Sequence, residues 1–130
     1  MNDYLEINNR RIGSGYPAYI VAEMSANHNQ SFDDAAKIIE AATQSGADAI
    51  KIQTYTPDTI TIDCDNDYFR IDNDNLWKGR NLYDLYSEAY TPWDWQPRLK
   101  EIADNLGIVL FSTPFDGTAV DFLETMKVPA

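Results

Sequence analysis

Four polar side chains stand in, or at the end of, short apolar segments of this sequence. They are Glu23, Lys51, Gln53 and Thr113. A lysine ammonium group and a threonine hydroxyl can bind an anionic small molecule, while an amide and a carboxylate can hydrogen-bond its polar groups. These residue types predict a site for a small polar ligand, provided that the fold brings them together.

Each of these side chains also has an explanation that needs no ligand. Lys51 can extend to solvent from the end of a strand, and Glu23 can form a structural ion pair with it. Gln53 can be an amide whose hydrogen bonds are satisfied in the core. Ser112, beside Thr113, can be a simple hydroxyl at a strand end.

Three short apolar segments have the composition of strands: residues 19–23, 49–54 and 108–113. The first is almost continuously apolar, as expected for a strand that is buried on both faces of a parallel sheet. In the second, a period of two places Lys51 and Gln53 on one face and the isoleucines on the other. Two polar side chains therefore share one face of the expected sheet.

In the second and third expected strands, a polar residue follows a helix-ending glycine at the same distance. Gly46 precedes Lys51 by five residues, and Gly107 precedes Ser112 by five. This spacing predicts polar residues at equivalent positions near the ends of neighbouring strands.

Helix signals separate the expected strands. Ser31 can cap a helix, and Thr91 followed by Pro92 predicts the start of a second helix by cap and first-turn proline. Asp116 can cap a short third helix, and residues 128–130 have the composition of the entry to another strand. Helices thus alternate with strands along the chain.

This alternation is the pattern of parallel α/β folds, in which crossover helices cover the sheet. A (β/α)8 barrel and a doubly wound sheet both fit. Polar residues at the carboxyl ends of successive strands favour the barrel, because barrel active sites are built at that rim. A barrel needs roughly 250 residues, so the chain is expected to supply only its N-terminal portion.

Two further segments frame these elements. Residues 1–14 are expected to form a hairpin around an Asn-Asn turn. Residues 55–90 are too long for an ordinary connection and are rich in Tyr, Trp and Phe. We expect this aromatic insert to fold over a site rather than to be a floppy linker.

Composition narrows the class of protein. The formal net charge of −11 argues against binding of nucleic acid or of an anionic membrane as the main activity. The first residues lack the basic start and apolar stretch of a secretion signal, so a cytoplasmic protein is expected. The single cysteine, Cys64, cannot form an internal disulfide and is expected to be a spectator.

Three motifs resemble those of the sialic acid synthase family in order and spacing. They are residues 20–29 (IVAEMSANHN), 51–54 (KIQT) and 111–115 (FSTPF). The resemblance covers nearly the whole chain from about Tyr19 onward. Residues 76–93, the end of the insert and the three residues after it, look like the pseudaminic acid branch of the family.

The resemblance implies a condensation of phosphoenolpyruvate with an open-chain amino sugar and water, here 2,4-diacetamido-2,4,6-trideoxy-L-altrose, to give pseudaminic acid and phosphate. It also implies a homodimer, an antifreeze-like domain after the barrel, and a divalent metal (Mn, Mg or Co). The metal ligands are two histidines on later strands, so no metal ligand is expected in this segment.

The resemblance also implies roles for individual residues. The expected catalytic residues are Glu23, Lys51 and Gln53. The residues expected to bind phosphoenolpyruvate are Lys51, Ser112 and Thr113. Those expected to bind the sugar are Glu23, Asn27, Gln53 and Tyr83.

One residue departs from the family pattern. Gln30 stands where the family usually has glycine, so a positive φ there would strain the loop. Two alternatives to the pseudaminic reading remain. One is synthesis of N-acetylneuraminate or legionaminate by the same mechanism, and the other is a non-catalytic binding or assembly module.

Overall fold

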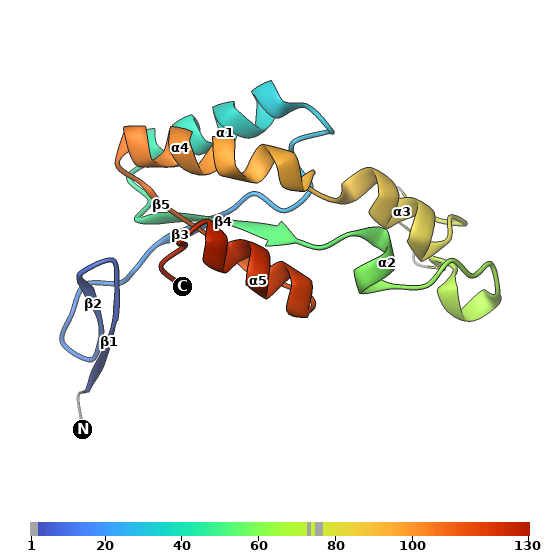
Figure 1. Ribbon diagram of the computed structural model, residues 1–130, viewed down its shortest axis with the longest axis horizontal. Coiled ribbons are helices and arrows are strands. Elements are labelled where there is room, and N and C mark those ends of the chain that lie inside the picture. Colours follow the sequence, from blue (N-terminus) through green and yellow to red (C-terminus); the bar gives the residue numbers. More distant parts are fainter. Residues whose placement is uncertain (1–2, 73, 75–76) are drawn as a thin grey trace.

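The core of the chain is a three-stranded parallel sheet (Figure 1). The computed structural model describes residues 3–72, 74 and 77–130. The strands are β3 (Val21–Glu23), β4 (Ala49–Thr54) and β5 (Val109–Pro114), and they lie in that order. Consecutive parallel strands with intervening helices are the first part of a (β/α)8 barrel, as the sequence predicts.

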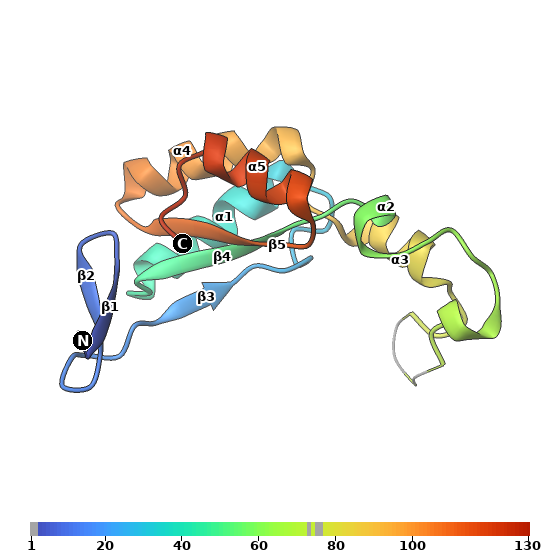
Figure 2. The same cartoon turned by 60° about the horizontal axis from the view of Figure 1, so that its bottom comes forward.

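Helices α1 (Phe32–Gln44) and α4 (Gln96–Leu106) lie side by side on one face of this sheet (Figure 2). Helix α5 (Gly117–Thr125) packs against β5. Fully buried apolar side chains fill the layer between helices and sheet. The main ones are Met24, Ile39, Ile50, Ile52, Leu99 and Leu110. The opposite face, which carries Lys51 and Gln53, is not covered by these helices.

Most helix ends lie where the sequence places them. The Ser31 hydroxyl accepts a hydrogen bond from the backbone N–H of Asp34, and the Asp116 carboxylate accepts from two N–H groups of α5. Gly107 ends α4 in the left-handed conformation, at φ +77°. These local signals are confirmed.

The start of the second helix is different from the prediction. A 3₁₀ turn, η2 (Trp93–Trp95), follows Pro92, and the regular helix begins only at Gln96. Thr91 does not cap the helix, because its buried hydroxyl lies 3.1 Å from Nε2 of His28. A tertiary hydrogen bond thus replaces the expected local one.

Strand β3 is also shorter and more exposed than predicted. Val21 is 40% exposed and the preceding Ile20 is 55% exposed. Among the described residues, no strand pairs with the outer edge of β3. The prediction of burial on both faces was therefore wrong for this chain. Residues 128–130 carry no strand.

The N-terminal hairpin is present as β1 (Tyr4–Ile7) and β2 (Arg10–Gly13), although residues 1–2 lie outside the described residues. Asn8 and Asn9, at φ +48° and +65°, form its turn. Arg10 pairs with Asp48, whose other carboxylate oxygen accepts from the backbone N–H of Ile20 at 2.7 Å. The hairpin is thereby attached at the amino end of the sheet.

The aromatic insert extends beyond the carboxyl ends of the strands (Figure 1). It contains α2 (Pro57–Ile60), η1 (Asp67–Phe69) and α3 (Leu82–Ala89), and its residues 73, 75 and 76 lie outside the described ones. The buried ring of Tyr55 packs edge-to-face on the rings of Tyr86 and Phe115, at centroid distances of 5.6 and 5.3 Å. Aromatic packing therefore holds the insert to the sheet.

Candidate active site

A charged pair marks the uncovered face of the sheet. Lys51 and Glu23 are paired residues of β4 and β3, and Nζ lies 2.8 Å from Oε2. The Ser25 hydroxyl donates to the other Glu23 oxygen at 3.2 Å. About a third of each charged side chain remains exposed (34% for Lys51 and 38% for Glu23), so an incoming ligand can reach both groups.

Gln53 and Thr113 continue the same face. They are paired residues of β4 and β5, and both are half-buried. Gln53 is two residues beyond Lys51, so its side chain lies on the same side of the strand. Neither the amide nor the hydroxyl is hydrogen-bonded to another described residue, and both are available to a ligand. The structure thus brings Glu23, Lys51, Gln53 and Thr113 together.

Ser112 lies on the opposite face of β5. Its side chain is 5% exposed, with Oγ 2.6 Å from the Thr54 hydroxyl, and it donates to the carbonyl oxygen of Ile52 at 3.1 Å. The spacing from glycine suggested that Ser112 matches Lys51, whereas the sheet pairs Lys51 with Phe111. A shift of one residue in a strand changes the face, so the structure does not place Ser112 beside the other candidates.

Asn27 stands in the loop after β3. It is exposed, and its side-chain amide donates to the carbonyl oxygen of Met24 at 2.8 Å. This bond fixes the loop at the carboxyl end of β3, close in sequence to Glu23. The Asn27 side chain is not hydrogen-bonded to Lys51 or Glu23, which are both described residues.

His28 is a buried structural residue of this loop. Its Nδ1 accepts a hydrogen bond from the backbone N–H of Gln30 at 3.1 Å, so its Nε2 carries the proton toward the Thr91 hydroxyl. Its ring packs edge-to-face on Trp95. Burial lowers the pKa of His28 below the ordinary value of 6.5, which favours the neutral ring. Thr91 has no local sequence signal for this partnership.

Tyr83 belongs to the insert. Its hydroxyl donates to the carboxylate of Asp58 at 2.9 Å and so joins α3 to α2. The hydrogen bond to Asp58 raises the pKa of the Tyr83 phenol above its ordinary value. The structure does not bring Tyr83 into contact with the four residues on the sheet face.

Metal ligands are not assembled in this part of the chain. Across residues 3–72, 74 and 77–130, no group of three or more His, Cys, Asp and Glu side chains could hold a metal ion. The residues of the sheet face do not fit a metal centre by themselves. The expected divalent metal, with ligands elsewhere, stays a prediction.

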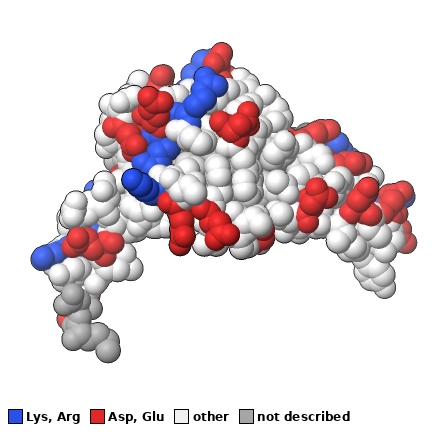
Figure 3. Space-filling model, viewed as in Figure 1, with Lys and Arg blue, Asp and Glu red and all other residues white. Residues whose placement is uncertain are grey.

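Lys51 is a positively charged group on a chain that is acidic overall. Acidic side chains are spread widely over the face of the molecule that Figure 3 shows, including the insert. The net charge of −11 would weaken the approach of an anion, so the ammonium group of Lys51 supplies positive charge where the sheet face needs it. None of the described helices is long and apolar enough to cross a membrane.

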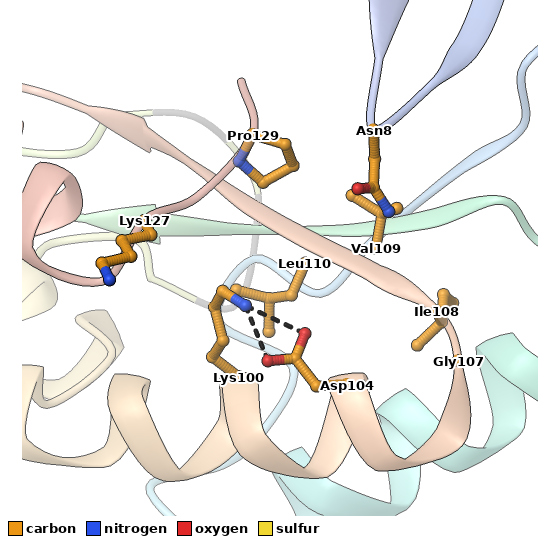
Figure 4. A pocket seen from close by; sticks show the side chains of 9 residues that line it. All are labelled: Asn8, Lys100, Asp104, Gly107, Ile108, Val109, Leu110, Lys127 and Pro129. Carbon is orange, nitrogen blue, oxygen red and sulfur yellow. Dashed lines mark hydrogen bonds and ion pairs between the residues drawn. The ribbon is translucent and has the colours of Figure 1, made fainter.

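A separate hollow lies at the amino end of β5, away from these residues (Figure 4). Lys100 and Asp104 of α4 form an ion pair there, with N···O distances of 2.7 and 2.9 Å. Asn8 of the hairpin turn lines the same hollow. Lys127 also lines this hollow, which lies at the opposite end of the strands from Gln53 and Thr113, so the hollow is not the candidate active site.

Enzymes with a β/α barrel build their sites from side chains near the carboxyl ends of the parallel strands, and the four residues of the sheet face fit that arrangement. The sequence model of the NeuB family matches residues 38–130. This chain belongs to the NeuB family.

Curated relatives refine the comparison. Pseudaminic acid synthase of Campylobacter jejuni (serotype O:2) is 50% identical over 106 residues, which are 82% of this chain and 31% of that protein. Pseudaminic acid synthase of Helicobacter pylori is 44% identical, over 87% of this chain and 33% of that protein. The chain therefore spans about a third of the length of these relatives.

A solved structure shows the same fold. N-acetylneuraminic acid synthetase from Leptospira borgpetersenii, in complex with citrate, superposes with a TM-score of 0.75 at 26% identity. The match covers 96% of this chain and 39% of that one.

Proposed function

We propose that the complete protein is a pseudaminic acid synthase. It would condense phosphoenolpyruvate with 2,4-diacetamido-2,4,6-trideoxy-L-altrose and water to give pseudaminic acid and phosphate. The placement of Lys51 beside Glu23, Gln53 and Thr113 carries the proposal of a synthase site. The identity of 44 to 50% with pseudaminic acid synthases supports the choice of sugar.

In the proposed reaction, carbon 3 of phosphoenolpyruvate forms a bond to the aldehyde carbon of the open-chain sugar. Water adds at carbon 2. The bond between carbon 2 and the bridging oxygen then breaks, and phosphate leaves with that oxygen. Phosphoenolpyruvate carries several negative charges, so the site needs a cation and hydroxyl donors. Lys51 supplies the cation, and Thr113 can donate to a phosphoryl oxygen.

Gln53 and Glu23 face the sugar in this proposal. The free amide of Gln53 can hydrogen-bond a hydroxyl or acetamido group from the same face as Lys51. Glu23 can accept a hydrogen bond from a sugar hydroxyl once phosphoenolpyruvate competes with it for Lys51. Asn27 and Tyr83 remain candidates for outer contacts with the sugar, since both lie on segments that follow strand ends.

The proposal includes a divalent metal, Mn, Mg or Co, bound by residues that this chain does not contain. When bound, the metal would polarise the sugar aldehyde. We also propose a cytoplasmic homodimer, on the strength of the family resemblance.

The alternatives have weaker support. N,N'-diacetyllegionaminic acid synthase of Legionella pneumophila is 32% identical, and N-acetylneuraminate-9-phosphate synthase of Homo sapiens is 25% identical. Within the part of the chain that the structure describes, no contact favours a non-catalytic module over an enzyme. The polar face at the strand ends favours the enzyme.

Phosphate release by the complete protein tests the proposal. The assay contains phosphoenolpyruvate, a divalent metal and one candidate amino sugar at a time. Metal-dependent release with only the altrose-derived sugar would support it. Release with N-acetylmannosamine that equals or exceeds this rate would move the protein to the sialic acid branch.

A further inference from the structure

Gln30 joins the loop after β3 to the end of the aromatic insert. Its side-chain nitrogen lies 2.6 Å from the carbonyl oxygen of Glu88 and 2.7 Å from that of Tyr90. These carbonyls stand at the C-terminal end of α3, where the backbone oxygens have no partner within the helix. Both amide hydrogens of Gln30 can thus be used on segments about sixty residues away in the sequence.

The backbone of Gln30 is held in an unfavourable conformation. Its φ is +54°, in the left-handed region, which glycine adopts far more readily. Glycine would relieve this strain but would have no side chain to reach Glu88 and Tyr90. The glutamine therefore accepts backbone strain and gains a connection to the insert.

A second connection runs beside the first. The backbone N–H of Gln30 donates to His28, and the other ring nitrogen of His28 lies 3.1 Å from the Thr91 hydroxyl. Tyr90 and Thr91 are consecutive residues. The two links therefore hold one point of the chain, where the insert ends and the path to α4 begins.

The joined segments both lead away from the candidate site. The loop follows Glu23, and the insert follows Gln53 and Thr54 of β4. A cleft of about 280 Å³ lies between them. It is lined by Ala26, Asn29, Gln30, Trp77, Glu88 and Ala89. Gln30 thus contacts the C-terminal end of α3 from the loop that follows β3.

We propose that Gln30 is a positioning residue that sets the placement of the insert and thereby the selectivity of the enzyme for its amino sugar. The inference rests on the proposed function, because the strand-end face must bind a sugar for the insert to influence selectivity. Gln30 acts through α3 and need not touch the substrate. It affects the sugar more than phosphoenolpyruvate, because Lys51 and Thr113, the residues proposed to bind phosphoenolpyruvate, lie on β4 and β5 and not on the insert.

Two variants of the complete protein test this role. Gln30→Glu keeps the size of the side chain but cannot donate to the two carbonyls. Gln30→Gly removes the side chain and also relieves the strain. For both we expect amide hydrogen exchange in residues 82–89 to accelerate and KM for the altrose-derived sugar to rise about tenfold, the effect of losing one or two hydrogen bonds. KM for phosphoenolpyruvate and kcat should change less than about twofold.

Two control variants separate this role from general effects. Lys127→Gly likewise introduces glycine at an exposed residue with φ +54°, at the end of α5. Gln44→Glu makes the same charge change at an exposed position of α1. Neither control should alter exchange in α3 or KM for the sugar.

Unchanged exchange of α3 in Gln30→Glu would overturn the connection itself. Faster exchange with an unchanged KM for the sugar would overturn the role in selectivity. If the wild-type protein turned over no sugar, the proposed function and the selectivity role would both be rejected, while the exchange rates would still decide whether Gln30 holds the insert.

Discussion

Nζ of Lys51 lies 2.8 Å from Oε2 of Glu23, across the pairing of β4 with β3. In this pair the carboxylate and the ammonium group neutralise each other on the sheet face. An anionic substrate must therefore compete with Glu23 for Lys51. The substrate can do so because the pair is partly exposed, where an ion pair contributes little to stability.

Lys51→Ala in the complete protein tests the role of the lysine. We expect kcat/KM for phosphoenolpyruvate to fall by about 3 kcal/mol or more, roughly a hundredfold, because a charged partner is lost from the site. Lys37→Ala, an exposed change on α1, is the control. Steady-state kinetics that show equal kcat/KM for wild type and Lys51→Ala would rule out the role.

Glu23→Gln tests the competition within the pair. We expect KM for the sugar to rise roughly tenfold, since a charged acceptor is replaced by a neutral one. KM for phosphoenolpyruvate should stay the same or fall, because Lys51 is no longer held by a carboxylate. Glu40→Gln, on the exposed side of α1, is the matched control. A parallel rise of both KM values would contradict this division of roles.

Neighbouring hydroxyls on opposite faces of β5 should behave differently. Ser112→Ala leaves Thr54 and the Ile52 carbonyl short of a buried hydrogen bond, which should lower the free energy of unfolding by about 1 to 3 kcal/mol. It should not change KM for phosphoenolpyruvate. Thr113→Val should raise that KM and leave the melting temperature nearly unchanged. If Ser112→Ala raised KM for phosphoenolpyruvate and left the stability unchanged, Ser112 would belong to the substrate site after all.

The elements of the fold follow from local sequence signals. A side-chain cap at Ser31, a glycine at Gly107 and the alternation around Lys51 each act within a few residues, so the sequence alone predicts their outcome. The grouping of Glu23 with Lys51 was also predictable, because parallel strands align their carboxyl ends.

Other features depend on contacts that no local signal contains. The face of Ser112 is set by the register between β4 and β5, which the spacing from Gly107 misses by one residue. Thr91 has the sequence of a helix cap, but a hydrogen bond to His28 uses its hydroxyl. The possible strain at Gln30 was visible in the sequence, whereas its bonds to Glu88 and Tyr90 appear only when the insert is folded.

The buried His28 predicts a dependence of stability on pH. Burial lowers the pKa of its ring in the folded protein below 6.5, so at higher pH the ring is neutral in both folded and unfolded states. As the pH falls below 6.5, the unfolded chain binds a proton that the folded chain resists. The stability that the neutral His28 ring contributes should therefore be fully present above pH 6.5. It should be lost as the pH falls toward the lowered pKa of the folded protein.

Thermal unfolding of the wild type and of His28→Gln, at about pH 7.5 and about pH 5.5, measures this effect. The acidic residues titrate in both proteins, so their effect on stability largely cancels when the wild type is compared with the variant at the same pH. We expect the wild type to be more stable at the higher pH and its advantage to shrink at the lower one. Protonation would also remove the ring acceptor from the N–H of Gln30, so exchange in α3 should quicken over the same range. An advantage that stays constant or grows as the pH falls would show that His28 remains satisfied when charged, and the neutral tautomer inferred from its two hydrogen bonds would then be wrong.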